Sequence, residues 1–126
     1  MQPLLAAIDL GTNNCRLLIA RIAGDTIHIV DSFSRIVRLG EHMAQTKRLA
    51  EPAMGRTLDA LKICADRIAR HKNIRVRAVA TAACRLAVNA PELIERARTE
   101  TGLDLHVVSA QEEARLAALG CAPPDR

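Results

Sequence analysis

Polar residues that could hold an anion follow the first apolar run of the chain. Asp9, Gly11 and Thr12 are followed by Asn13 and Asn14 before the next apolar run begins. Gly, Thr and Asn turn the chain tightly and can leave backbone N–H groups and a hydroxyl pointing outward, an arrangement that can cradle phosphate. Asp9 is too acidic to contact phosphate directly at neutral pH, so it would instead hold a hydrated divalent cation. The same residues also suit an ordinary hairpin, in which the Asp and Asn side chains satisfy the backbone donors of the turn.

Arg85 is a second candidate for phosphate binding. It follows residues 76–80, a short apolar run predicted to be a strand, at the level where α/β sheets place their ligands. A guanidinium there can clamp phosphate with two hydrogen bonds, although an arginine in a loop is also often simply solvated. Asn89 is predicted to cap the next helix, with Pro91 in its first turn and Glu92 as a capping-box partner, so we interpret it as structural.

Two neighbouring glutamates open the last predicted helix. Ser109 and Glu112 have the spacing of a capping box, which gives Glu112 a local role at the start of the helix. Glu113 has no such partner and faces about 100° away from Glu112. It is therefore free to act elsewhere. Its alternative role is that of a carboxylate that interacts favourably with the helix dipole.

The hydrophobic pattern predicts an α/β domain in the order β-β-β-α-β-α-β-α. The first run, residues 4–10, is predicted to be a strand buried on both faces, and Gly24-Asp25 predicts a tight hairpin after the second strand. Pro52 predicts the start of the first helix. Three antiparallel strands followed by alternating helices and strands imply a mixed five-stranded sheet. The remaining predicted elements are strands over residues 15–22, 26–39, 76–80 and 105–108 and helices over residues 90–101 and 110–119.

The composition describes a single domain with an aliphatic core. The chain has 126 residues, of which 49% are apolar, and Phe33 is the only aromatic residue. The net charge of +4 permits an anionic partner, but one aromatic residue provides no platform for stacking nucleic-acid bases. No leader-like or membrane-spanning apolar run is found, so we expect a cytoplasmic protein. Four cysteines without a C-x-x-C pair are expected to be reduced core thiols, Cys15, Cys64, Cys84 and Cys121.

Several stretches, taken in order, resemble one family. Ile8-Asp9-Leu10-Gly11-Thr12-Asn13-Asn14 resembles the first phosphate motif, I-D-x-G-S/T-N-S/T, of the exopolyphosphatase and guanosine pentaphosphate phosphohydrolase (Ppx/GppA) family, with Asn14 where Ser or Thr is usual. The resemblance continues through Arg38-Leu39-Gly40, residues 79–89 and residues 107–116, and it extends from about residue 4 to residue 120. The first motif has relatives in actin-like ATPases and sugar kinases, whereas the motifs together are specific.

The resemblance implies an actin-like, ribonuclease H-like lobe over residues 1–121, with residues 122–126 beginning a linker to a second lobe. In the family the second lobe starts with another phosphate loop, D-x-G-G-G-S, which does not occur in these 126 residues. Glu113 matches the catalytic glutamate, which orients and deprotonates the attacking water, and Arg85 matches a phosphate-binding arginine. The other expected site residues are Gly11, Thr12, Asn13 and Asn14 for phosphate, Asp9 for Mg²⁺ or another divalent cation through water, and Glu112 and Arg16 in support.

The reaction implied by the resemblance is hydrolysis of the terminal phosphoanhydride bond of inorganic polyphosphate, with release of orthophosphate. Guanosine pentaphosphate is the alternative substrate, although no residue here recognises a guanine. Two other classes remain open, an actin-like kinase lobe and a non-catalytic module that binds polyanions. We expect the lobe alone to be weakly active or inactive, because the other half of the site would come from the second lobe. The intact protein could form a homodimer.

Overall fold

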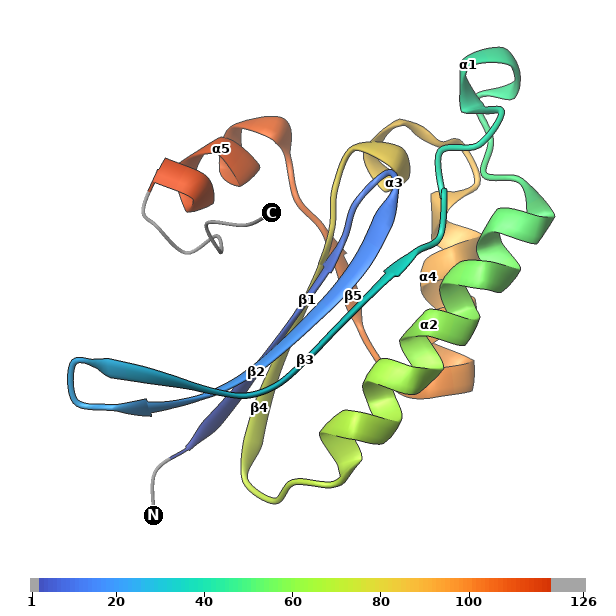
Figure 1. Ribbon diagram of the computed structural model, residues 1–126. Helices are drawn as coiled ribbons and strands as arrows, with labels where there is room; N and C mark the ends of the chain where they lie inside the picture. The colour runs from blue at the N-terminus through green and yellow to red at the C-terminus, as the bar shows by residue number, and fades with distance from the viewer. Residues whose placement is uncertain (1–2, 119–126) are drawn as a thin grey trace.

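A mixed sheet of five strands forms the centre of the molecule (Figure 1). The computed structural model describes residues 3–118, and the strands are β1 (Leu4–Leu10), β2 (Asn14–Ala23), β3 (Thr26–Ile36), β4 (Ile74–Ala80) and β5 (Leu105–Val107). In space they follow the order β3-β2-β1-β4-β5. β2 pairs antiparallel with β1 and β3, while β4 runs parallel to β1 and β5. The predicted mixed five-stranded sheet is therefore confirmed.

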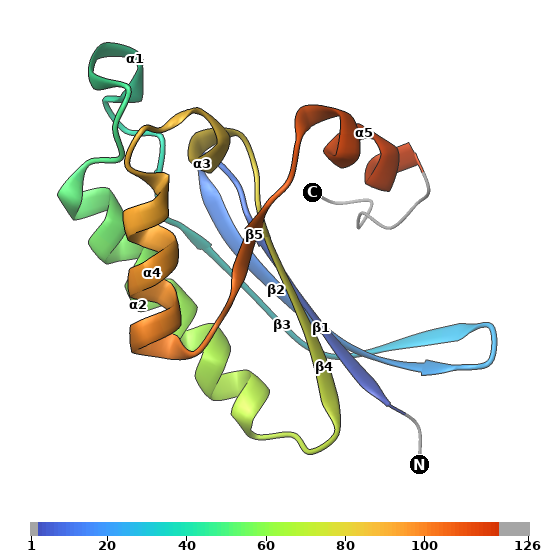
Figure 2. The same ribbon diagram turned by 180° about the vertical axis from the view of Figure 1, so that it is seen from behind.

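Two long helices cover one face of the sheet. α2 (Glu51–Ala69) and α4 (Ala90–Thr101) lie side by side on that face, and α5 (Ala110–Ala118) lies on the opposite side (Figures 1 and 2). The order of strands and long helices agrees with the prediction. The sequence does not predict α1 (Met43–Thr46) or α3 (Ala82–Leu86), because so few residues show no helical period. Within residues 3–118, none of the helices is long and apolar enough to cross a membrane.

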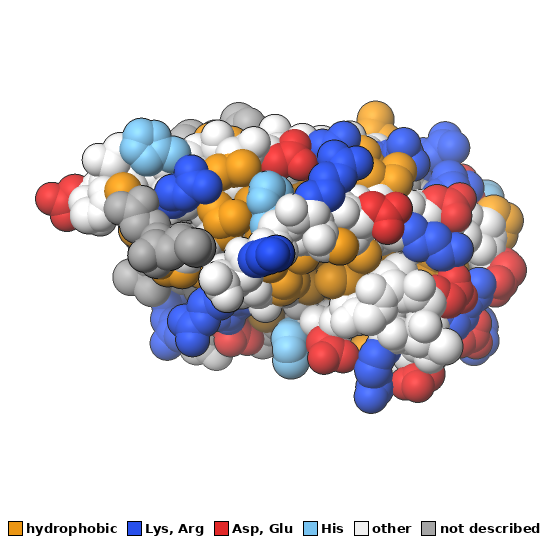
Figure 3. All heavy atoms as spheres, turned by 90° about the horizontal axis from the view of Figure 1, so that it is seen from below, with side chains coloured by type: hydrophobic (Ala, Val, Ile, Leu, Met, Phe, Trp, Pro, Cys, Tyr) orange, Lys and Arg blue, Asp and Glu red, His pale blue; other side chains and the backbone are white. Residues whose placement is uncertain are grey.

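The core lies between the sheet and these two long helices. Ile8 of β1 and Leu61 of α2 belong to the same hydrophobic cluster and are 1% and 0% exposed. Leu5 and Ala7, which alternate with Ile8 along β1, are exposed on the other face. The expectation that residues 4–10 are buried on both faces is thus wrong for the described chain, because α2 and α4 cover only one face. Viewed from the end opposite to the β1–β2 hairpin, other hydrophobic side chains also reach the surface between charged ones (Figure 3).

A segment between β3 and α2 is hydrogen-bonded to the hairpin that joins β1 to β2. We call this segment, residues 37–49, the strap. The N–H groups of Val37 and Arg38 both donate to the carbonyl of Asn13, at 2.8 and 3.0 Å. Arg38 has a φ of 46°, which turns the chain sharply. β3 therefore ends before the strap, whereas the sequence predicts that it continues to residue 39.

Gly40 brings the strap into close contact with Thr12. The Gly40 N–H donates to the Thr12 carbonyl at 3.0 Å. A Cβ atom at position 40 would lie 2.5 Å from Cγ2 of Thr12, which is closer than real Cβ atoms approach a neighbour. The strap can therefore bind the hairpin at this distance because position 40 has no side chain.

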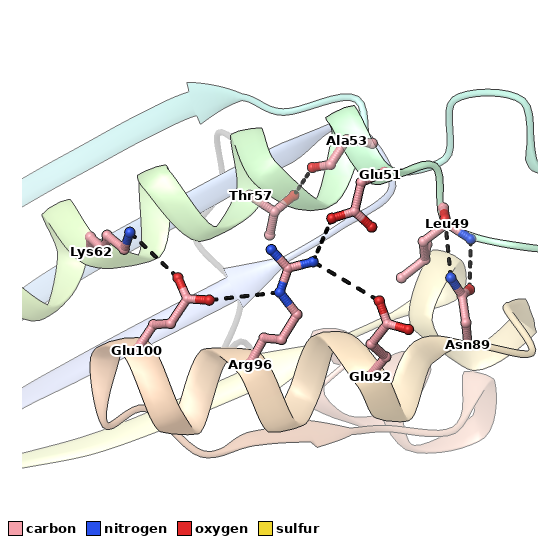
Figure 4. Close-up of polar contacts among 9 residues, drawn as sticks. All are labelled: Leu49, Glu51, Ala53, Thr57, Lys62, Asn89, Glu92, Arg96 and Glu100. Carbon is pink, nitrogen blue, oxygen red and sulfur yellow. Dashed lines mark hydrogen bonds and ion pairs between the residues drawn. The ribbon is translucent and has the colours of Figure 1, made fainter.

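The far end of the strap is fixed to the loop that precedes α4. The Val88 N–H donates to the Lys47 carbonyl at 3.0 Å. The Asn89 side chain accepts a hydrogen bond from Leu49 N–H at 2.8 Å and donates through Nδ2 to the Leu49 carbonyl at 3.1 Å (Figure 4). Asn89 occupies the N-cap position of α4, but its side chain makes no cap hydrogen bond. The predicted capping role is therefore wrong, because this amide binds Leu49 instead.

Three cysteines, Cys15, Cys64 and Cys84, are buried and have no disulfide. This confirms the expectation of reduced core thiols for them, whereas Cys121 lies outside the described residues. Burial raises the pKa of the Cys84 thiol to about 11, because desolvation disfavours the thiolate. The neighbouring Cys64 raises the pKa of the Cys15 thiol well above its usual range. The raised pKa values make Cys15 and Cys84 poor nucleophiles in the folded chain, whereas the hydrogen bond with Cys15 lowers the pKa of Cys64.

The contact between Gly40 and Thr12 predicts opposite effects for two glycine-to-alanine substitutions. Gly40→Ala should lower the free energy of unfolding by about 1–3 kcal/mol, because the added methyl group overpacks the contact. Gly55→Ala is the matched control. It lies within α2 with no atom near its added Cβ, and it should raise the free energy of unfolding by about 0.5–1 kcal/mol. Urea denaturation measures both changes, and a neutral or stabilising Gly40→Ala would contradict the close approach.

The raised pKa of Cys84 predicts how this thiol responds to alkylation. In the folded chain, iodoacetamide at mildly alkaline pH should leave Cys84 unmodified, because its thiolate forms only near a pKa of about 11. In urea the ordinary pKa of about 8.5 returns, and modification should become fast. Mass spectrometry of the Cys84 peptide measures the difference. Equal modification in the folded and unfolded chain would show that the thiol is not buried.

Candidate active site

The candidate residues come from three segments that meet at one edge of the sheet. β1, β4 and β5 are parallel, so their carboxyl ends lie at the same edge. The β1–β2 hairpin follows β1 there, α3 follows β4, and α5 begins shortly after β5 (Figure 1). Ligands of open α/β sheets bind beyond the carboxyl ends of the strands. The fold therefore gathers the predicted residues where a ligand would be expected.

The hairpin exposes side chains while its backbone is fixed. Thr12 and Asn13 have exposed side chains, and the strap holds their carbonyl groups. The Gly11 N–H donates to the Asn14 carbonyl at 2.9 Å, which closes the turn. Because the carbonyl groups are already bonded, the turn does not depend on its own side chains for its shape. The exposed Thr12 hydroxyl and Asn13 amide can therefore donate hydrogen bonds to an anion.

Asn14 is placed differently from its neighbours in the hairpin. It is the first residue of β2, and its Oδ1 atom is buried without a hydrogen-bond partner among the described residues. An unpaired buried acceptor costs about 1–3 kcal/mol, and such an atom suits a donor rather than a phosphate oxygen. The Nδ2 group is the part of this side chain that can donate to phosphate. Asn14 therefore fits a phosphate site through its amide nitrogen alone.

Asp9 and Arg16 lie opposite each other on the adjacent strands β1 and β2. They are register partners of β1 and β2, and Asp9 lies on the face of the sheet that α2 and α4 do not cover. Side chains of directly opposed residues on one face are about 5 Å apart at Cβ. Arg16 therefore lies close to Asp9, at the base of the hairpin, rather than at its tip. This position suits the supporting role expected for it.

Asp9 is the carboxylate beside the hairpin that could help to hold a metal ion. Within residues 3–118, no group of three or more His, Cys, Asp or Glu side chains could hold a metal. Mg²⁺ usually keeps several waters and is held by one or two carboxylates together with phosphate oxygens of the substrate. Asp9 beside the β1–β2 hairpin fits such a loosely held ion. It does not make a complete metal site.

Thr81 connects the hairpin to the segment that carries Arg85. Thr81 directly follows β4 and is 7% exposed. Its N–H donates to the Leu10 carbonyl at 3.0 Å, and its own carbonyl accepts the Arg85 N–H at 3.0 Å. Sequence reasoning missed this residue, although a polar residue at a strand end, ahead of a candidate arginine, is a usable signal. Through Thr81 the position of Arg85 is tied to the end of β1.

Arg85 and Glu113 are in direct contact. Nη1 of Arg85 donates to the Val108 carbonyl at 2.7 Å and to Oε1 of Glu113 at 3.3 Å. The two side chains are 25% and 39% exposed, so the ion pair is open to solvent. An exposed pair of this kind is worth about 0–1 kcal/mol, which means that a bound anion can displace the carboxylate from the guanidinium. The Val108 carbonyl would still hold the guanidinium in place.

Glu112 makes different contacts from this pair. Its N–H donates to the Ser109 hydroxyl at 3.0 Å, which confirms the Ser109 half of the predicted capping box. Its side chain lines an open hollow of about 900 Å³ beside β5, together with residues of α2 and β4 such as Ile68 and Val76. Glu113 does not line that hollow. Among the described contacts, Arg85 is therefore bonded to Glu113 and not to Glu112.

Comparisons with known proteins identify the family and the fold of the chain. Residues 18–123 match the model of the Ppx/GppA phosphatase family. The Ppx/GppA family member of Aquifex aeolicus is 38% identical in sequence, with a TM-score of 0.90 over 95% of this chain and 39% of its own. An exopolyphosphatase from Cytophaga hutchinsonii is 34% identical, with a TM-score of 0.85 over 90% of this chain and 36% of its own.

A more distant structure bears on the fold alone. The ethanolamine utilization protein EutJ of Carboxydothermus hydrogenoformans is 13% identical, with a TM-score of 0.56 over 95% of this chain and 41% of its own. Together with the closer matches it supports the actin-like fold expected for the lobe. The chain spans about two-fifths of the length of these structures. The family model and the two closer structures show that the chain belongs to the Ppx/GppA phosphatase family.

Proposed function

We propose that the intact protein hydrolyses the terminal phosphoanhydride bond of inorganic polyphosphate and releases orthophosphate. The observation that carries this proposal is the contact between Arg85 and Glu113 at the sheet edge that also holds the β1–β2 hairpin. Membership of a phosphatase family supports a phosphohydrolase, and similarity to an exopolyphosphatase supports this substrate. The net charge of +4 suits an anionic chain.

In this mechanism Glu113 acts on the attacking water. Its carboxylate accepts a proton from water while the water oxygen attacks the terminal phosphorus in line with the bond to the rest of the chain. That bond breaks, the shortened chain leaves, and orthophosphate is formed. General-base catalysis contributes about 10²–10⁴-fold, so positioning and charge neutralisation must supply the rest.

Arg85 would bind the phosphoryl group that is transferred. Its guanidinium can donate two parallel hydrogen bonds to phosphate oxygens, which offsets their negative charge. The bond to the Val108 carbonyl at 2.7 Å fixes the direction of the side chain before the substrate arrives. Substrate binding replaces the Glu113 carboxylate at the guanidinium, and this frees the carboxylate to accept a proton from water.

The hairpin would hold the same phosphate from the other side. Thr12 and Asn13 contribute side-chain donors, while Asn14 contributes its amide nitrogen. Mg²⁺ held through water by Asp9 would add positive charge next to the phosphate oxygens, which is the chemistry that a divalent cation supplies in such sites. Arg16 lies next to Asp9 and would keep that carboxylate in position.

Substitution of the two neighbouring glutamates tests the assigned base. Glu113→Gln in the intact protein should lower the rate of orthophosphate release from polyphosphate by about 10²–10⁴-fold, because an amide cannot accept the proton. Glu112→Gln is the matched comparison and should lower the rate far less, since the described contacts join Arg85 to Glu113 and not to Glu112. Both variants should unfold at nearly the same temperature as the wild type. Undiminished release by Glu113→Gln would overturn the assignment.

The same assay separates the two substrates of the family. Wild-type protein should release orthophosphate from long-chain polyphosphate with a higher kcat/KM than from guanosine pentaphosphate, because nothing in the described lobe is suited to a guanine. A clear preference for guanosine pentaphosphate would favour the 5′-phosphatase instead. Loss of release from both substrates on chelation of divalent cations, with recovery on addition of Mg²⁺, would show that the reaction requires a divalent cation.

We also propose that residues 1–126 alone release little phosphate. The chain spans 39% of the Aquifex aeolicus structure, and the family resemblance implies that a second lobe contributes the facing phosphate loop. Residues 1–126 and the intact protein should therefore be compared at equal molar concentration with polyphosphate and Mg²⁺. Release by residues 1–126 at a rate close to that of the intact protein would show that one lobe is sufficient.

A further inference from the structure

One arginine of α2 binds the strap at several points. Nε of Arg56 donates to the Val37 carbonyl at 2.9 Å, and Nη2 contacts Oε2 of Glu41 at 3.1 Å. Nη2 also lies 3.5 Å from the Arg38 carbonyl. The Arg56 side chain is 31% exposed, and its guanidinium donates hydrogen bonds to the strap. A single guanidinium therefore links α2 to three residues of the strap.

Two of the residues that Arg56 binds also form hydrogen bonds with the hairpin. Val37 and Arg38 offer their carbonyl groups to Arg56 and their N–H groups to Asn13. Within the same turn of chain, Gly40 donates to the Thr12 carbonyl. A displacement of this part of the strap would therefore move the backbone of both exposed hairpin residues. Arg56 contacts neither of them, so any effect it has on the hairpin passes through the strap.

The hydrogen bonds from Arg56 stabilise a strap whose backbone conformation is unfavourable. Arg38, His42 and Lys47 have φ values of 46°, 65° and 60°, in the left-handed region that side chains disfavour. Residues with such backbone angles persist only where the surroundings hold them. The hydrogen bond from Arg56 lowers the pKa of Glu41 below its usual range. That contribution to stability is therefore present above the usual pKa of a glutamate and is lost as the pH falls through the lowered value.

We propose that Arg56 is a positioning residue for phosphate binding: it holds the strap so that the strap fixes the backbone of Thr12 and Asn13. This inference rests on the proposed function in one respect, which is that the hairpin binds the phosphate of the substrate. The role requires the planar fork of arginine, because the side chain must reach a carbonyl and a carboxylate at once. A lysine ammonium keeps the charge but cannot reproduce that geometry.

Arg96, which joins α4 to α2, provides a matched control. Arg96 of α4 is 34% exposed and pairs with Glu51 at 2.8 Å, Glu100 at 3.6 Å and Glu92 at 3.9 Å (Figure 4). Arg96 thus joins α4 to α2 with a similar exposure, but none of its ion-pair partners belongs to the strap or the hairpin. Its substitution should affect stability in a similar way and leave the hairpin in place.

The first measurement is hydrogen–deuterium exchange of the intact protein without substrate. In Arg56→Ala, the amides of Val37, Arg38 and Gly40 should exchange faster than in the wild type, while those inside β1 keep their protection. Arg56→Lys should show a smaller increase in the same amides, and it provides a second variant should Arg56→Ala fold poorly. Arg96→Ala should leave these amides unchanged. Unchanged protection of the strap in both Arg56 variants would overturn the proposal.

The second measurement is orthophosphate release from tripolyphosphate. Displacement of a site by about 1 Å can cost on the order of 10²-fold, so Arg56→Ala should lower kcat/KM by about 10-fold to 100-fold. Arg56→Lys should recover part of this loss, and Arg96→Ala should stay close to the wild type. Faster exchange of the strap together with undiminished kcat/KM would overturn the positioning role. If the wild type released no phosphate, the proposed function would fail, whereas the exchange data would still decide whether Arg56 holds the strap.

Discussion

Parallel pairing of β4 with both β1 and β5 is the constraint on which the candidate site depends. It places three strand ends at one edge of the sheet, and the segments that carry the hairpin, Arg85 and Glu113 all begin there. The hydrogen bond from Thr81 N–H to the Leu10 carbonyl continues this pairing by one residue beyond the strands. If β4 ran antiparallel to β1, Arg85 would emerge at the opposite end of the molecule. The chemistry is therefore a consequence of strand direction as much as of residue type.

The sequence predicted features that lie within a single element better than contacts between elements. The different directions of Glu112 and Glu113 follow from helical geometry alone, and the structure shows that they face different surroundings. The contact between Arg85 and Glu113 joins residues 28 positions apart and depends on the register of β4 and β5, which no local pattern contains. Similarly, the apolar run at residues 4–10 looks the same whether helices cover one face of its strand or both.

Competition for polar groups explains the other differences from prediction. Asn89 has the local spacing of a helix cap, but the backbone of Leu49, 40 positions away, offers both a donor and an acceptor to its amide. A side chain that can satisfy two buried backbone groups contributes more there than at an N-cap, where it would satisfy one. Arg56 carries no local signal, because its three partners are distant in sequence and lie outside the strands and helices. Long-range partners of this kind become visible only in three dimensions.

The close approach of Gly40 to Thr12 couples these two positions in a way that sequence comparison could detect. The atom that would meet a side chain at position 40 is Cγ2 of Thr12, the methyl group that distinguishes threonine from serine. Every other atom near that point is at least 3.8 Å away, an ordinary contact distance. A serine at position 12 would keep the hydroxyl and leave room for an alanine at position 40. The two positions should therefore vary together among related proteins, with alanine at the second tolerated only beside serine at the first.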